Sequence, residues 1–512
     1  MKDITELNGA KEYKRMEDSR QPFLDRAKEA SKLTIPQLYP EITEDSHYTN
    51  YPSPYQSLGA RGTNNLANKM ILSLFPPATA FFKLGMNQLA QEQSGVSEGD
   101  LQTAMYKIEK AIVDEMEVSQ LRSALVEILK QGTVGGSAIL HIAEEGEPKF
   151  YNLNEFVIKR SKSGKVLKLI IQENINILEL DDDIVAQLED LDDKERKGEK
   201  DLKVYTIIAL GDDKKYHVVQ EIKGIKIKGS KGSYREEELP YIFVPFVDRK
   251  ENYGRSYVED FIGDLQSYEG LRQAILEASS EAARLIYLVR PNAIITPKNL
   301  ENARSGDVLL GNPDDVAVLQ ADKRLDVSMA QQEAEVLRTD LATAFLLDSA
   351  VRRNAERVTA EEIRRVSQEL EVALGGIYST LANVLQEPLV RLYLKRLVKK
   401  GFIKNILKEN IKLEITTGSA ALGRGTEFRA IQEFASFAAT MLGEAASQYL
   451  NVPEFLSRAA YSLDVNTGDL VKTKEQLEAE AAQAQQRQLE QQAVGPAINA
   501  ANQQELAKQQ GN

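Results

Sequence analysis

The sequence feature that most constrains the fold is a long block of short β-type runs with no helix between them. From about Ala138 to Val247 such runs follow one another, separated by Gly and charged turns such as the one at 162–164. The runs are AILHIA, KFYNL, FVIKR, VLKLIIQ, KVYTIIAL, KYHVVQEI and IKIKG. Because no helical segment alternates with the strands, the block predicts an antiparallel α+β unit rather than a doubly wound parallel sheet.

Helical patterns flank this block on both sides. On the N-terminal side, residues 102–130 place apolar side chains at three- and four-residue steps, which predicts an amphipathic helix. On the C-terminal side, Ser256 and Glu259 have capping-box spacing, and the helix that they open is expected to run to about Val289. Short strands and turns are expected over 291–326, and a second helix over 327–347.

The longest helical pattern opens at a second capping box, Thr359 with Glu362. It is expected to bend at Glu387–Pro388 and to end at Gly401, a fitting residue just past a helix C-terminus. A strand (KLEITT), two smaller helices over 426–442 and 453–463, and a Gln/Ala-rich tail from Thr473 complete the expectation. The fold class predicted is therefore α+β, mainly α.

Composition excludes several kinds of chemistry. The 512 residues include no cysteine, so disulfides, thiolate metal sites and cysteine nucleophiles are excluded. His47, His141 and His217 lie far apart, so no local histidine metal motif exists. A net charge of −13 argues against a basic protein that coats nucleic acid. The charged N-terminus is not a signal peptide, and the apolar run 70–82 is too short to span a bilayer, so a soluble, intracellular protein without a cofactor is expected.

Two motifs invite a ligand-binding interpretation. The acidic stretch Asp181–Asp193 could bind calcium, but it lacks the spacing and central glycine of an EF-hand, which favours a solvated surface loop. The segment Gly224–Lys231 comes nearest to a phosphate-binding loop, yet Ser230 stands where the lysine is required. Gly132–Gly136 is expected to end a helix rather than to bind phosphate.

Arg352, Arg353 and Arg357 form a basic cluster at a break between two long helices. Three fixed positive charges there could contact phosphates. The alternative is a solvated helix connection with local pairing to Glu356. The residues alone leave both interpretations open.

Three long segments resemble the head-to-tail connector, or portal, proteins of short-tailed podovirus phages. They are ARGTNNLANKMILSLFPP (60–77), YGRSYVEDFIGDLQSYEGLRQAI (253–275) and RVTAEEIRRVSQELEVALGGIYSTLANVLQEPLVR (357–391). TIPQLYP (34–40), LPYIFVPF (239–246) and TTGSAALGRG (416–425) agree in the same order.

The resemblance implies a portal-type ring subunit, with twelve copies around a central DNA channel at one capsid vertex. The implied parts are a wing with antiparallel strands (1–255), a first stem helix (256–290), a small α/β clip (291–326), a second stem helix (327–347), a channel loop (348–358), a long wing helix and strand (359–424), crown helices (425–472) and a C-terminal tail (473–512).

The implied function is a non-enzymatic conduit for double-stranded DNA, without sequence specificity, during packaging and ejection. The implied partners are further copies of the chain, the large terminase packaging motor, tail adaptor and tail tube proteins, and the major capsid and scaffolding proteins, with no membrane. The implied location is the head-tail junction of the virion, after assembly in the host cytoplasm.

The resemblance also implies roles for named residues. Arg352, Arg353 and Arg357 would face DNA in the channel loop, and the clip would dock partners through Arg304, Asp307, Asp314 and Asp315. Two other functions stay open. A capsid scaffold or shell protein would lack a clip inserted between two stem helices, and a packaging ATPase would need a phosphate-binding loop and an acidic metal ligand.

Overall fold

The computed structural model describes residues 4, 7–40, 51–77, 81–86, 98–188, 191–282, 286–319, 324–347, 360–401, 411–414, 423–443, 455–456 and 482–484. The chain divides into two compact units. The first comprises residues 1–81 and 112–404, and the second comprises residues 82–111 and 405–512.

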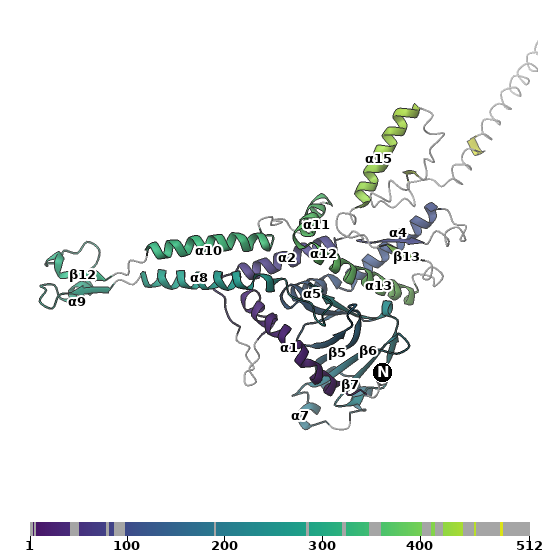
Figure 1. Cartoon of the computed structure of the whole chain (residues 1–512), viewed down its shortest axis with the longest axis horizontal. Helices are drawn as coiled ribbons and strands as arrows, with labels where there is room; N and C mark the ends of the chain where they lie inside the picture. Colours follow the sequence, from purple (N-terminus) through teal and green to yellow (C-terminus); the bar gives the residue numbers. More distant parts are fainter. Residues whose placement is uncertain are drawn as a thin grey trace, which may run out of the picture. The chain divides into compact units, whose positions relative to one another are not determined.

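Helices precede the strands of the first unit (Figure 1), as the sequence predicts. They are α1 (Gly9–Leu33), α2 (Leu58–Leu74), the end of α4 (Glu98–Val118) and α5 (Leu121–Gly135). The single helix expected over 102–130 is wrong in one respect, because Gln120 adopts a left-handed φ of 57° that separates α4 from α5. Gly136 ends α5 with a φ of 78°, which confirms that this glycine-rich segment ends a helix.

The strands between α5 and residue 245 form two antiparallel sheets. A six-stranded sheet contains β4 (Phe156–Arg160), β5 (Val166–Ile175), β6 (Leu202–Leu210), β7 (Tyr216–Ile222) and β8 (Ile225–Lys226) in that order, with β9 (Gly232–Tyr234) also paired to β7. A three-stranded sheet has the order β10 (Tyr241–Pro245), β2 (Ser137–His141), β3 (Lys149–Tyr151). Every pair is antiparallel, so the predicted α+β class is confirmed.

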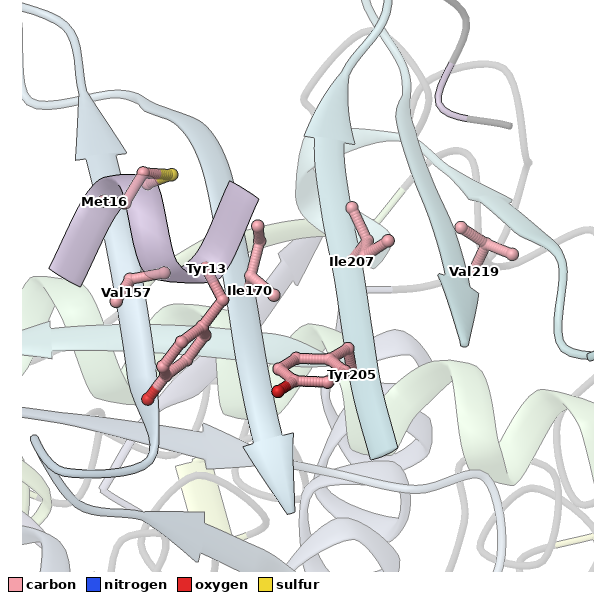
Figure 2. Packing of buried hydrophobic residues seen from close by; sticks show 7 residues of the cluster. All are labelled: Tyr13, Met16, Val157, Ile170, Tyr205, Ile207 and Val219. Carbon is pink, nitrogen blue, oxygen red and sulfur yellow. The ribbon is translucent and has the colours of Figure 1, made fainter. Parts of the chain in front are cut away.

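Helix α1 covers one face of the larger sheet (Figure 1). Figure 2 shows the resulting core, in which two residues from α1 lie on side chains from four adjacent strands. Its members are Tyr13, Met16, Val157, Ile170, Tyr205, Ile207 and Val219. Tyr205 and Ile207 share this face because alternate residues of a strand point to the same side.

The acidic stretch is only partly as predicted. Asp181, Asp182 and Asp183 are exposed, but the segment is not simply a loop, because it contains α6 (Asp182–Val185) and α7 (Asp193–Arg196). Leu188 packs in a small core with Ile177, Leu202, Val204, Ile222 and Ile227. The described residues contain no group of three or more acidic or histidine side chains placed to hold a metal ion. At Gly224–Lys231 the chain makes the β7–β8 hairpin turn instead of a helix start, with φ of 81° at Gly224.

The helix expected to reach Val289 is wrong at its end, where residues 286–289 form a strand. It begins as a 3-10 turn (Val258–Phe261), continues as α8 (Ile262–Ala282) and gives way to a strand, β11 (Ile286–Val289). Only half of the capping box forms: Ser256 Oγ accepts from Glu259 N at 3.2 Å, while the Glu259 carboxylate pairs with Arg26 at 3.1 Å.

The segment after β11 contains α9 (Pro297–Asn302), a 3-10 turn (Pro313–Asp315) and β12 (Val316–Leu319). Short strands are expected over 291–326, where AIITP (293–297) is the first apolar run, yet no strand forms at AIITP and β12 pairs with β11. The second predicted helix is confirmed as α10 (Arg324–Ala344), which lies beside α8 (Figure 1).

The long helix predicted from 359 to 400 is divided. The segments are α11 (Ala360–Leu374), α12 (Gly376–Leu381), a π-helical turn (Ala382–Gln386) and α13 (Glu387–Lys399). Gly375 separates the first two with a φ of 50°, and the π turn ends one residue before the bend predicted at Glu387–Pro388. Gly401 follows α13 with a φ of 80°, as expected, whereas Thr359 lies outside the described residues.

The second unit contains a two-stranded antiparallel sheet and helices. Strand β1 (Lys83–Met86) pairs with β13 (Ile411–Glu414), and Leu84 N donates to Glu109 Oε1 at 2.7 Å. Helix α15 (Gly423–Leu442) confirms the helix predicted over 426–442. Most of the helix predicted over 453–463 and most of the tail lie outside the described residues.

Candidate functional site

The α8–α10 hairpin carries little core of its own. Each helix has 21 residues, which at ~1.5 Å per residue gives a length of roughly 30 Å. Among the side chains that the structure describes, the buried apolar ones are Leu265, Tyr268 and Ile275 on α8, and Ala334, Leu341 and Ala342 on α10. Large apolar side chains remain exposed, namely Leu276 at 46%, Met329 at 67% and Val336 at 55%. A hairpin of this kind offers surface for a partner.

The hairpin is also acidic. Its two helices contain eight acidic and three basic residues. One of the basic residues, Arg338, is held by Glu335 through hydrogen bonds of 2.6 to 2.9 Å. The surface of α8 and α10 therefore repels polyanions over most of its length.

The base of the hairpin is fixed by aromatic packing. Phe345, which follows α10, is fully buried and lies 6.0 Å from the ring of Tyr257 and 5.8 Å from that of Phe261. Tyr257 Oη donates to Ala344 O at 2.9 Å. A Cβ at Gly62 of α2 would come within 2.6 Å of Phe345, so only glycine allows α2 to approach this closely.

Two polar residues of α2 bind the carbonyl groups at the end of α10. Asn65 Nδ2 donates to Phe345 O at 3.0 Å and to Leu346 O at 2.8 Å. Lys69 Nζ donates to Leu346 O at 2.9 Å and pairs with Glu369 of α11 at 3.2 Å. Lys69 is only 3% exposed, and burial lowers the pKa of its ammonium group while Glu369 opposes that shift.

Lys69 therefore connects the two helices that flank residues 348–359. Arg352, Arg353 and Arg357 belong to that interval and lie outside the described residues, so their predicted role stays a prediction. Sequence reasoning missed Lys69 because a single lysine within an apolar helix resembles an ordinary surface charge. No local signal reports that its partners lie about 280 to 300 residues further along the chain.

The segment 286–319 is an antiparallel hairpin with an extended tip. Strands β11 and β12 pair from Ile286 with Leu319 to Val289 with Val316. Of the predicted docking residues, Asp315 stabilises the base of this hairpin, because its carbonyl accepts from Arg290 N at 3.0 Å and its carboxylate lies 4.0 Å from Arg290. Asp314 lies exposed in the adjoining 3-10 turn.

Arg304 and Asp307 share one exposed turn, in which Arg304 N donates to Asp307 Oδ2 at 2.6 Å. Apolar residues that no sequence motif marks lie in the same segment. Val308 is 94% exposed, Leu310 is 88% exposed and Ile294 is 75% exposed. Three exposed aliphatic side chains on one short segment are typical of a protein-binding surface. The signal available in the sequence was the apolar run Val308–Leu310, which lies between Asp307 and Gly311.

Among the described residues, no helix combines the length and apolar character needed to cross a membrane.

Comparison with known proteins covers most of the chain. The family model described as "Bacteriophage head to tail connecting protein" matches residues 8–469. The portal protein of Escherichia phage T7 is 36% identical over 488 residues, which cover 93% of this chain and 90% of that protein. The portal protein of Enterobacteria phage T3 is 36% identical over 484 residues, covering 92% and 90%. The portal protein of Enterobacteria phage SP6 is 27% identical over 518 residues, covering 96% of each. All these matches include the α8–α10 hairpin and the segment between its helices.

Proposed function

The chain belongs to the bacteriophage head to tail connecting protein family, and from this premise we propose that twelve copies form a ring that conducts double-stranded DNA. It is a portal protein of the podovirus type, with relatives of that name along nearly its whole length. In the proposal, α8 and α10 are the stem helices and the arginine-rich interval 348–358 is the channel loop. The clip, expected over 291–326, is extended to start with β11 at Ile286, and its described part ends at Leu319.

The observation that carries the ring is the exposure of the α8–α10 hairpin. Leu276, Met329 and Val336 lie on helices that have little to pack against within one chain. Burying such side chains is favourable by roughly 1.5 to 3 kcal/mol each. Copies of the chain placed side by side around an axis would cover them.

The acidity of the same hairpin supports the conduit. Duplex DNA carries one negative charge per ≈ 1.7 Å of its axis, and a basic wall would hold it by releasing counterions. A wall with eight acidic and three basic residues per copy would instead let DNA slide. Nothing in the sequence resembles a recognition helix, so binding without sequence specificity follows.

The clip would contact the partners. Val308, Leu310 and Ile294, together with Arg304 and Asp307, form its exposed surface. We assign to this surface the large terminase packaging motor and later the tail adaptor and tail tube, and to the wing the capsid and scaffolding proteins. The ring would be assembled in the host cytoplasm and reside at the head-tail junction of the virion.

The proposed role is structural and not enzymatic. The nearest approach to a phosphate-binding loop, Gly224–Lys231, starts in the hairpin turn after β7 and continues through β8 instead of opening a helix. A scaffold or shell protein would not need a clip inserted between two stem helices, so the α8–clip–α10 arrangement favours the portal role.

Negative-stain electron microscopy of the purified full chain tests the proposal. Rings with twelvefold symmetry and an axial hole are expected. Monomers or closed shells would contradict it, as would ATP hydrolysis that persists through extensive purification.

A further inference from the structure

A polar cavity of about 260 Å³ opens at the base of the α8–α10 hairpin, and none of the functions above uses it. Its lining comes from the loop before α2, from the first turn of α2, and from both hairpin helices. The lining residues that matter here are Tyr55, Gln56, Ser57, Arg61, Arg272 and Arg338.

Three arginines from three helices line this cavity. Arg61 lies in the first turn of α2, Arg272 on α8 and Arg338 on α10. Arg338 is held by Glu335, as described above. The guanidinium groups of Arg61 and Arg272 have neither a hydrogen bond nor an ion pair with any residue that the structure describes. Two cations that form no ion pair with a described residue therefore face one polar hollow.

The loop that closes one side of the cavity is held in place by Glu269. The Glu269 carboxylate accepts from Tyr55 N at 2.7 Å and from Gln56 N at 3.2 Å. Gln56 in turn donates through Nε2 to Leu33 O at 2.7 Å and accepts from Gly59 N at 2.9 Å. The acidic residue nearest to Arg272 in sequence is thus engaged with backbone N–H groups.

The amino end of α2 adds to the positive potential. Ser57, at the N-cap of this 17-residue helix, makes no side-chain capping bond, and both Ser57 and Leu58 line the cavity. Gln56 already accepts from Gly59 N, so the contribution of this helix end comes mainly from its dipole, which favours an anion. This contribution supplements that of the arginines.

We propose that Arg61, Arg272 and Arg338 form a binding site for a phosphate group. Guanidinium donors match the oxygens of phosphate, and donors that converge from three helices suit a tetrahedral anion with several oxygens better than a two-oxygen carboxylate. A compensating anion also explains why Arg61 and Arg272 face a hollow at the base of a hairpin that is otherwise acidic. The phosphate has two sources: the backbone of duplex DNA, which rests on the proposed function, or a free phosphate compound, which does not.

Calorimetric titration of the full chain with inorganic phosphate tests the site. The variant Arg61→Ala/Arg272→Ala should bind phosphate at least about tenfold more weakly, because each charge-assisted hydrogen bond contributes strongly to affinity. Arg61→Lys/Arg272→Lys keeps the charge but removes the planar fork, so its affinity should be intermediate. Lys14→Ala/Arg15→Ala is the matched control: it removes two exposed positive charges from α1 and should bind like the unchanged protein.

A second arm distinguishes the two sources. Fluorescence anisotropy with a labelled duplex, repeated over a series of salt concentrations, should give a slope shallower by about 0.9 for each DNA phosphate that the Ala variant no longer binds. Weaker phosphate binding with unchanged DNA binding would support the site and assign it to a free phosphate compound.

Three results would overturn the proposal. The first is the absence of phosphate binding to the unchanged protein, and the second is equal binding by the Ala variant. The third is loss of ring assembly in a folded Ala variant, since the arginines would then hold a carboxylate of a neighbouring copy. If the unchanged protein forms no rings but binds phosphate through Arg61 and Arg272, the site stands and the proposed ring fails.

Discussion

At the scale of single residues, burial in a sheet lowers the pKa of His141 and so keeps its imidazole neutral. It lies on the central strand β2, opposite Tyr241 of β10 and Lys149 of β3. Its ring stacks on that of Tyr241, with centroids 4.2 Å apart and an interplanar angle of 5°. Burial, and secondarily the positive charge of Lys149, lower the pKa of His141 to about 4.

This pKa predicts an acid-sensitive contribution to stability. Above pH 6.5 both folded and unfolded chains hold a neutral imidazole. Between pH 6.5 and about 4 only the unfolded chain binds the proton, so the free energy of unfolding should decrease as pH falls, by up to about 3 kcal/mol. Urea unfolding at several pH values should show a flatter profile for His141→Phe, which keeps the stacking. Parallel profiles for the two proteins would contradict this assignment.

Lys69 gives a second prediction at this scale. Lys69→Met removes the ion pair with Glu369 and the hydrogen bond to Leu346 O. Because Lys69 is buried, we expect a loss of roughly 2 to 3 kcal/mol in the free energy of unfolding. Lys130→Met breaks a more exposed pair with Glu127 and should cost less than about 1 kcal/mol. Equal losses for the two variants, measured by urea unfolding, would argue against the anchoring role of Lys69.

At the scale of helices and strands, adjacent glycines provide a matched pair of substitutions. Gly375 has φ 50° and ψ −123°, a conformation that side chains with a Cβ rarely adopt, although open space surrounds it. Gly375→Ala should therefore destabilise the protein by about 1 to 3 kcal/mol through backbone strain alone. Gly376→Ala, in helix α12 and equally open, should be neutral or stabilising by up to about 1 kcal/mol. Thermal unfolding that shifts equally for both would show that the left-handed break is not required.

The sequence predicts most of these elements where short apolar runs rich in β-branched residues are bounded on both sides by turn or charged residues. The runs that became β4 to β7 are of this kind, and their antiparallel order follows from the absence of helices between them. The run Ile286–Val289 does not carry such a signal: four apolar residues before Arg290–Pro291 suit a helix end or a strand equally well. The run becomes a strand because it pairs with β12, about 30 residues further along the chain.

The candidate site was less accessible to sequence reasoning than the fold. In the segment 286–319 charged residues were predicted to dock partners. Asp315 instead stabilises the hairpin, and the more exposed side chains are Val308 and Leu310. Exposure depends on what the rest of the chain leaves uncovered. Periodicity over a few residues cannot report that property.

The exposed tip of the clip predicts weaker docking when its apolar side chains are replaced. Val308→Ser with Leu310→Ser should leave the free energy of unfolding within about 0.5 kcal/mol and should leave rings intact, because neither side chain is buried. Binding of the tail adaptor should weaken by about tenfold or more, because two aliphatic side chains no longer pack against it. Val372→Ser, which alters an 88% exposed side chain on α11, serves as the control. Co-sedimentation of rings with the adaptor measures the effect, and unchanged docking would remove these residues from the partner surface.

At the scale of the whole molecule, the distribution of charge matters more than its total. The chain carries −13 overall, and α8 with α10 follow that trend. Arg352, Arg353 and Arg357 depart from this acidic trend, because they place three positive charges within six residues. In a ring of twelve, three arginines per copy would give up to 36 positive charges in one narrow belt. Acidic walls would let DNA slide, and such a belt would hold phosphates transiently and resist slippage.

The belt leads to a prediction that separates grip from assembly. Arg352→Ala with Arg353→Ala should leave rings intact, because a polar connection between helices contributes little buried apolar area, and Lys69 holds its flanking helices independently. Retention of packaged DNA should fall, and DNA binding to rings should depend less steeply on salt, by about 0.9 in slope for each DNA phosphate that is no longer neutralised. Lys14→Ala/Arg15→Ala removes the same charge from α1 and should leave both measurements unchanged.

Arg357 stays out of the variant because it adjoins the predicted cap at Thr359 and could pair with Glu361 instead. Unchanged retention and an unchanged salt slope in the double variant would leave the interval as a solvated connection between helices.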